Sequence, residues 1–150
     1  MLWNNLKLQL VRFGPNNDMK EDPLIFGQDY NTFLTRNDVV KDLGINIDQD
    51  LNYKSQRQKA IAKANQKAGW ILRTFRDRSP SFIRRLWCTL VLPHMDYCSI
   101  LWAPENEIYA LLALKEPLRS FSKKAYGLKH LSYWERLNEL KLTSMERRVE

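Results

Sequence analysis

The sequence predicts an α+β protein that is mostly α-helical, in which a short β-rich beginning precedes a basic helical bundle. Before residue 50, short apolar runs alternate with turn residues; residues 8–13, for example, are followed by a Gly-Pro-Asn-Asn-Asp turn signal. From about Asn52, apolar residues recur every three or four positions, which is the period of an amphipathic helix. The chain has 150 residues, enough for one domain or for one domain and part of another.

One β-strand is expected near the end of the β-rich part. Leu43, Ile45 and Ile47 share one side of a strand by the two-residue period, so we expect that side to be buried. Gly44 would allow a close approach to the backbone. Asp48 and Asp50 follow two residues apart, and we interpret them as an exposed turn and not as a metal-binding pair.

The first long helix is predicted from an apolar stripe and a basic face. The stripe is spaced 3, 4, 3 and 4 residues apart and comprises Ile61, Ala64, Ala68, Ile71 and Phe75. At about 100° per residue, Lys59, Lys63, Trp70 and Arg73 lie away from this stripe. Long cations around an aromatic residue on a face that the core does not need indicate a candidate nucleic-acid surface.

Further helices are predicted by caps and prolines. Ser79 and Pro80 should cap and open a helix, and Pro93 should kink or end it. Apolar spacing resumes at residues 95–102, which is consistent with one bent helix or with two helices in series. Another helix should span about residues 106–126, interrupted near Pro117 and ended by Gly127. Capping boxes are expected at residues 132–135 and 143–146. Most of the aromatic residues of this region should be core: Trp87, Tyr97, Trp102, Tyr109, Phe121, Tyr126, Tyr133 and Trp134.

Positive charge is concentrated in the helical part. The net charge is +7, yet residues 1–50 hold five Lys and Arg against eight Asp and Glu. Between residues 54 and 85 there is one acid, Asp77, and ten bases: Lys54, Arg57, Lys59, Lys63, Lys67, Arg73, Arg76, Arg78, Arg84 and Arg85. A solvated helix face would also carry such charges, but few acids are present to pair with them, so we expect nucleic acid, an anionic membrane surface or an acidic protein as the class of partner.

Cysteine and histidine do not indicate a metal or catalytic site. Cys88 and Cys98 should be reduced, because no secretory signal is seen. Their spacing to His94 and His130 lacks the close pairs of a zinc site. His94 and Cys98 could face each other on a helix, but no orienting acid accompanies them, so helix packing is the favoured role. Apolar runs are too short to span a membrane.

Four segments in order resemble the region that follows the active site in LINE-type (non-LTR) retrotransposon reverse transcriptases. They are residues 39–48 (VVKDLGINID), 65–78 (NQKAGWILRTFRDR), 86–104 (LWCTLVLPHMDYCSILWAP) and 127–148 (GLKHLSYWERLNELKLTSMERR). The resemblance implies that residues 1–50 are the end of the polymerase palm, residues 51–104 are thumb-like basic helices, and residues 105–150 are a helical connection segment.

The resemblance also implies the residues that would grip nucleic acid. The KDLG segment corresponds to a primer grip, which implies Lys41 to Ile45, and the helices after it correspond to a thumb. The expected nucleic-acid-binding residues are Lys41, Gly44, Lys59, Lys63, Lys67, Trp70, Arg73 and Arg76. If about five cations engage phosphates, the salt dependence of log K should have a slope near −4.5. Lys7 matches the palm-motif lysine only ambiguously.

Catalytic residues are expected to be absent from this chain. In the family, the aspartates that hold two Mg²⁺ ions lie before the first residue of this sequence, so we expect no catalytic residue, metal site or cofactor here and no polymerisation by the chain alone. The implied partners are the RNA template and DNA primer, as an RNA:DNA hybrid, and the missing palm and fingers, with no membrane. The implied location is intracellular, in cytoplasm and nucleus. The rivals are a stand-alone basic helical nucleic-acid-binding module and a non-functional retroelement remnant.

Overall fold

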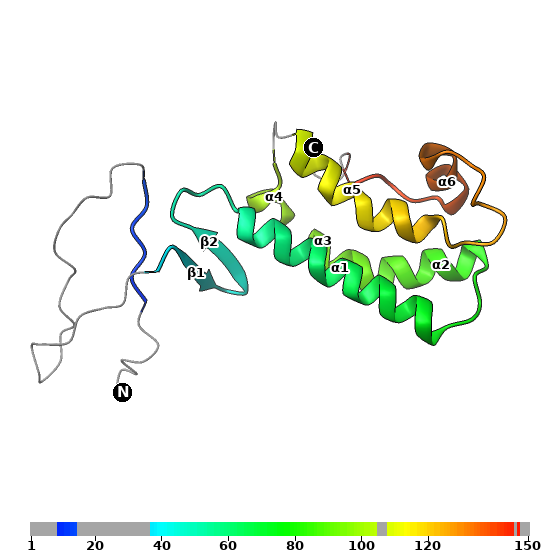
Figure 1. Ribbon diagram of the computed structural model, residues 1–150, viewed down its shortest axis with the longest axis horizontal. Coiled ribbons are helices and arrows are strands. Elements are labelled where there is room, and N and C mark those ends of the chain that lie inside the picture. Colours follow the sequence, from blue (N-terminus) through cyan, green and yellow to red (C-terminus); the bar gives the residue numbers. More distant parts are fainter. Residues whose placement is uncertain (1–8, 15–36, 105–107, 146, 148–150) are drawn as a thin grey trace, which may run out of the picture. The chain divides into compact units, whose positions relative to one another are not determined.

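The computed structural model describes residues 9–14, 37–104, 108–145 and 147 of the chain. It divides into two compact units, Met1–Gln56 and Arg57–Glu150, which are described separately below. The described residues form a two-stranded antiparallel sheet and a set of helices, so the prediction of a mostly helical α+β chain is confirmed (Figure 1). The three-part division at residues 50 and 104 stays a prediction.

A β-hairpin lies in the described part of the first unit. Strands β1 (Val39–Asp42) and β2 (Ile45–Asp48) pair in antiparallel register, with Asp42 opposite Ile45. Leu43 and Gly44 form the two-residue loop, with φ of 44° and 89°. Positive φ at both positions is the requirement of a type I′ turn, the turn whose twist matches that of the flanking strands.

Leu43 therefore corrects the sequence prediction. It does not share a buried strand side with Ile45 and Ile47, because it lies in the turn and is 84% exposed. Ile45 is buried and Ile47 half-buried, so the predicted side exists but is shorter than expected. The two-residue period continues through the sequence at Leu43, but the chain reverses there, and a local pattern does not reveal that reversal.

A third extended segment lies beside the hairpin in the first unit. The Asn37 N–H donates to the Leu10 carbonyl (3.0 Å), and the Gly14 N–H donates to the Gln49 carbonyl (3.2 Å). Leu10 forms an isolated bridge, so residues 9–13 are extended without being a continuous strand. Residues 24–26, another of the short apolar runs of the predicted β-rich beginning, and Lys7 lie outside the described residues.

Side chains from β2 and from the loop after it hold the start of helix α1 (Lys54–Thr74). The Asp48 carboxylate accepts the Ser55 N–H (3.2 Å), and the Asn52 side-chain oxygen accepts the Lys54 N–H (2.9 Å). These bonds satisfy N–H groups that the first turn of a helix leaves free. Asp48 is buried, not the exposed turn residue that we expected, because capping α1 requires it to point inward.

Helix α1 buries a narrow stripe of mostly small residues in the second unit. Ala64, Ala68 and Ile71 are buried as predicted, while Ile61 and Phe75 are only half-buried. Ala60, which the predicted stripe omitted, is also buried. The stripe is thus centred on the alanines, whose small side chains allow neighbouring elements to approach α1 closely.

A second long helical segment returns alongside α1, as Figure 1 shows. It consists of α2 (Pro80–Leu86), a π-helical turn η2 (Trp87–Val91) and α3 (Leu92–Asp96). Pro93 does not end the helix, because the preceding π turn accommodates the missing N–H, and Leu92 donates to the Trp87 carbonyl five residues earlier. The kink that the sequence predicted at Pro93 is therefore a π-helical turn in the residues before the proline.

The start of α2 agrees with the prediction in position and differs in the cap. Pro80 occupies the first turn, as expected. The Ser79 side chain makes no capping bond to the helix; its hydroxyl donates to the Asp77 carboxylate (3.1 Å), which also accepts the Ser79 N–H (2.7 Å). Asp77, the one acid of the basic stretch, therefore orders the connection between α1 and α2.

After α3 the chain turns through Cys98, which has a left-handed φ of 51°, into the short helix α4 (Ser99–Trp102). Buried Trp102 donates its indole N–H to the Tyr97 carbonyl (2.8 Å), which fixes this turn. The two short helices in series are one of the two arrangements that the sequence left open.

Helices α5 (Ile108–Ser122) and α6 (Tyr133–Leu140) complete the second unit. Pro117 does not interrupt α5, and the helix ends at Ser122, before Gly127, so both of those boundaries were wrong. The capping box of Ser132 and Glu135 is confirmed. The second expected box ends at residue 146, which lies outside the described residues.

The core of the second unit lies where α6 packs against α2 and α5 (Figure 1). Trp87 and Phe121 are fully buried, with ring centroids 5.4 Å apart. The expectation that most aromatic residues are core was wrong, because four are largely exposed: Tyr97, Tyr109, Tyr126 and Trp134. None of the helices in the described part of the chain has the length and apolar character needed to cross a bilayer.

Candidate nucleic-acid interface

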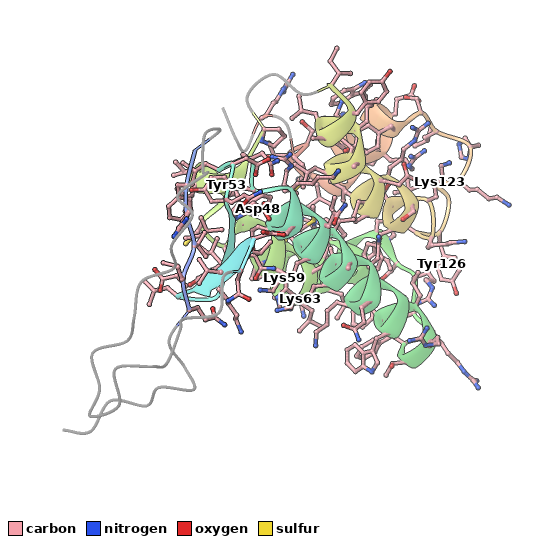
Figure 2. All side chains as sticks on the ribbon, turned by 60° about the vertical axis from the view of Figure 1, so that its left-hand side comes forward. Asp48, Tyr53, Lys59, Lys63, Lys123 and Tyr126 are labelled. Atoms are coloured by element: carbon pink, nitrogen blue, oxygen red, sulfur yellow. The ribbon has the colours of Figure 1, made fainter. Side chains whose placement is uncertain are left out.

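The candidate interface is one side of α1, which we call the basic face: Lys59, Lys63, Lys67, Trp70 and Arg73. Lys63, Lys67 and Arg73 are exposed, Lys59 is half-buried, and 44% of Trp70 is exposed. Figure 2 shows Lys59 and Lys63 projecting from the same side of α1. This face forms because the alanine stripe turns inward, and the residues about a third of a turn away from it must then face outward.

Trp70 is held within the basic face by contacts on two sides. The Lys67 ammonium lies 6.0 Å from the centroid of its ring, a cation–π distance, and Phe75 meets the ring edge-on at 5.9 Å. Phe75 in turn contacts the ring of Phe82 at 5.5 Å. Trp70 therefore packs partly within its own chain, and its exposed remainder is available for stacking.

Arg76 and Arg78 differ from the cations of the basic face, because both follow the end of α1. The Arg76 side chain is exposed, and its carbonyl accepts the Tyr126 hydroxyl (3.3 Å). The Arg78 guanidinium donates to the carbonyls of Leu72 and Phe75. It thereby satisfies carbonyls that the last turn of a helix leaves free, a structural role that the charge count of the sequence did not reveal.

Lys41 and Gly44 belong to the first unit and not to the basic face. Lys41 lies on β1 opposite Asn46 and is exposed. Gly44 occupies the second position of the hairpin turn, where its φ of 89° favours glycine. The turn itself therefore accounts for this glycine, whether or not a ligand approaches it.

Three cations outside the predicted set were missed. Lys123, Lys124 and Lys129 surround the loop between α5 and α6 and line a pocket with Tyr126. The signal in the sequence was three lysines within seven residues around Gly127, but the expected helix through residue 126 would have placed Lys123 and Lys124 on its last turn and only Lys129 in the loop. The loop that gathers them follows from the early end of α5.

Metal-binding groups do not gather in the described part of the chain. No cluster of three or more His, Cys, Asp or Glu residues there could hold a metal ion. His94 lies on α3, whereas Cys98 lies beyond the end of that helix and is exposed, so they do not share a helical face. The expected packing role for Cys98 was therefore wrong.

Comparisons with protein-family models, with curated proteins and with solved structures give no match for this chain. The resemblance to LINE-type reverse transcriptases accordingly rests on the ordered segments of the sequence. The candidate interface rests on the charge and geometry of α1.

Proposed function

We propose that this chain is the palm end and thumb of an RNA-directed DNA polymerase of the LINE type, which holds the template and primer during target-primed reverse transcription. The observation that carries the proposal is the basic face: four cations and a half-exposed Trp along one side of a 21-residue helix, with the packing stripe on another side. This division of α1 places the exposed side chains of Lys63, Lys67 and Arg73 on a side of the helix that the packing stripe does not use.

The dimensions of the basic face suit a nucleic-acid backbone. At 1.5 Å per residue, Lys59 to Arg73 spans about 21 Å along the helix axis. At a rise of 3.4 Å per base pair, that length corresponds to about six base pairs of duplex. Phosphate contacts of this kind position a duplex without reading its sequence, which is what a polymerase thumb requires.

The catalytic step would belong to the palm and fingers of the polymerase. The described residues hold no carboxylate cluster suited to two metal ions, and in the family the aspartates and their Mg²⁺ lie earlier in the polypeptide. Exposed apolar residues between α3 and the first turns of α5 would suit contact with the rest of a polymerase: Tyr97, Ile100, Leu101, Ile108, Tyr109 and Leu112.

A stand-alone nucleic-acid-binding module is the second candidate. The observation that favours it is the core of the second unit, where Trp87, Phe121 and Leu137 are buried by residues of this chain. Such a module would be monodisperse and would unfold cooperatively without a partner. A region of a polymerase would instead self-associate through its exposed apolar residues or gain stability from contact with the rest of the palm.

Binding of an RNA:DNA hybrid by the full chain tests the proposal. Fluorescence anisotropy should be recorded at several salt concentrations with a labelled hybrid, duplex DNA, single strands and heparin. With four or five phosphate contacts, log K should fall with log salt with a slope of about −3.6 to −4.5, and hybrid should be preferred over heparin. Absence of binding at low salt from a folded sample would refute the assignment of the basic face.

A further inference from the structure

A pocket of about 510 Å³ lies at the C-terminal end of α5 and in the loop that leads to α6. Glu116 and Ser120 line it from α5, and Lys123, Lys124, Tyr126 and Lys129 line it from the loop that follows. Its size falls in the range of small-molecule sites, roughly 300–1,000 Å³. Figure 2 places Lys123 and Tyr126 away from Lys59 and Lys63, so this pocket is separate from the basic face of α1.

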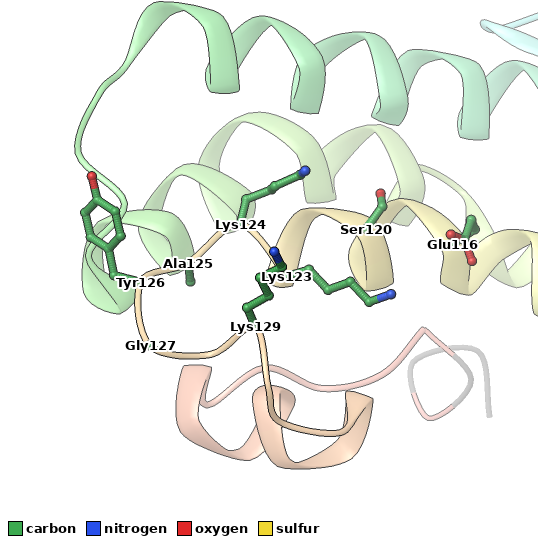
Figure 3. Close-up of a pocket in the computed structure, with 8 residues that line it drawn as sticks. All are labelled: Glu116, Ser120, Lys123, Lys124, Ala125, Tyr126, Gly127 and Lys129. Atoms are coloured by element: carbon green, nitrogen blue, oxygen red, sulfur yellow. The ribbon is translucent and has the colours of Figure 1, made fainter.

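The pocket carries an excess of positive charge. Three lysines and one glutamate line it, which gives a formal charge of +2, and all four side chains are exposed at its surface. Figure 3 shows Lys129 extending from the loop toward the end of α5, from which Lys123 and Lys124 leave in different directions. Several ammonium groups around one pocket suit an anion with several acceptor oxygens.

The loop that presents these lysines is anchored at several points. The Tyr126 N–H donates to the Arg78 carbonyl (2.8 Å), and its hydroxyl donates to the Arg76 carbonyl (3.3 Å). Ala125 and Leu128 are buried on either side, and Gly127 reverses the chain at a φ of 73°. A fixed backbone lowers the conformational entropy that is lost when the lysines close on a ligand.

We infer that this pocket binds a terminal phosphate monoester, either the phosphorylated end of a nucleic-acid strand or the phosphate of a free nucleotide. A phosphate monoester carries a charge of about −1.5 to −2 at pH 7 and offers three acceptor oxygens. An internal phosphodiester of a strand carries only a single charge. A site of formal charge +2 therefore complements the monoester better than the diester, and the pocket has room for the attached sugar.

Binding of matched ligands with and without the terminal phosphate tests this inference. The probes are a ten-nucleotide DNA strand with either a 5′-phosphate or a 5′-hydroxyl, and adenosine 5′-monophosphate with adenosine as its control. Isothermal titration calorimetry on the full chain should show about a tenfold preference for the phosphorylated form, equivalent to about 1.4 kcal/mol. If the monophosphate alone binds as tightly as the phosphorylated strand, the ligand is a free nucleotide; if only the strand binds, it is a strand end. Equal affinities with and without phosphate would overturn the inference.

Two double variants, each of which removes two positive charges, distinguish binding in this pocket from binding at the basic face. Lys123→Gln with Lys129→Gln should abolish the preference for the terminal phosphate. Lys63→Gln with Lys67→Gln should preserve it while weakening hybrid binding. Lowering the pH from 7.5 to 5.5 should also reduce the preference, because the second pKa of a phosphate monoester is about 6. If the basic face proves not to bind the RNA:DNA hybrid, the preference for a terminal phosphate can still be measured, and so can its loss in Lys123→Gln with Lys129→Gln. A preference that survives in the pocket variant would contradict the site.

Discussion

The Arg136 guanidinium donates through Nε to the Ser122 hydroxyl at 3.0 Å, and both residues are buried. This hydrogen bond joins α6 to the end of α5. Nη1 of the same guanidinium donates to the Leu131 carbonyl (2.6 Å), whereas Nη2 has no hydrogen-bond partner among the described residues. The planar guanidinium of the buried Arg136 thus holds α6 against the end of α5.

Arg136→Lys should therefore destabilise the second unit. A lysine ammonium reaches one of the two acceptors but cannot reproduce the fork of the guanidinium. The expected loss in the free energy of unfolding is roughly 1–3 kcal/mol, the cost of leaving a buried polar group unsatisfied. Urea denaturation measures it, with Arg119→Lys on the exposed side of α5 as the control. Equal stability of Arg136→Lys and the unmodified chain would show that the two hydrogen bonds contribute little.

Reversing the exposed charges of the basic face should weaken hybrid binding and spare the fold. Lys63, Lys67 and Arg73 changed to Glu leave the alanine stripe untouched. An exposed charge pair contributes up to about 1 kcal/mol, so reversing three should lower the affinity at low salt by roughly a hundredfold or more. Anisotropy measures the affinity and circular dichroism the fold.

The control for that reversal changes the same charge elsewhere. Arg119, Lys141 and Arg147, all exposed, are changed to Glu. If this control weakens hybrid binding as much as the reversal on α1, net charge and not the basic face governs binding.

Trp70→Ala should lower affinity for single strands and slightly lower stability. Base stacking on an aromatic ring contributes about 1–3 kcal/mol per base. Loss of the edge-on contact with Phe75 should cost about 0.5–1.5 kcal/mol of unfolding free energy. Trp134→Ala is a close control, because Trp134 is also about half exposed and has the Lys115 ammonium 5.9 Å from its ring centroid. Equal effects of the two variants on affinity would argue against stacking at Trp70.

Leu43→Asn should stabilise the hairpin of the first unit. A leucine with φ of 44° is in the left-handed region, which costs most residues roughly 1–2 kcal/mol and asparagine less. Asn-Gly is also the preferred pair for a type I′ turn. Hydrogen exchange of the strand amides should slow in Leu43→Asn and stay unchanged in Leu43→Ala, which keeps the strain. Faster exchange in Leu43→Asn would mean that the leucine side chain itself supports the turn.

The capping box of α6 should make stability depend on pH. The hydrogen bonds with the side chain and then the backbone of Ser132 lower the pKa of Glu135. A carboxyl with a lowered pKa in the folded state stabilises the fold above its ordinary pKa, about 4.3, and loses this contribution as pH falls through the lowered value. The stability difference between the unmodified chain and Glu135→Gln should thus be complete above about pH 5 and shrink toward pH 3. A difference independent of pH would exclude the charge of Glu135 as its source.

Several local features could be predicted because they depend on neighbouring residues alone. The burial of Ala64 and Ala68 on α1, the start of α2 at Pro80 and the capping box at Ser132 all follow from spacing over three or four residues. Pro117 shows where such reasoning ends. It has no N–H to donate, yet it is buried inside α5, and packing against other elements, which no local rule includes, compensates for the lost hydrogen bond.

The sequence by itself determined the class of fold, the position of the main stripe of α1 and the basic face beside it, because side-chain periodicity and charge are local properties. Tertiary structure alone decided which aromatic residues are buried and that Arg136 lies inside the protein. It also gathered Lys123, Lys124 and Lys129 around one pocket. Which side chains are buried depends on which distant segments pack against each other. The free energy of that packing comes from the whole chain and not from any short segment of it.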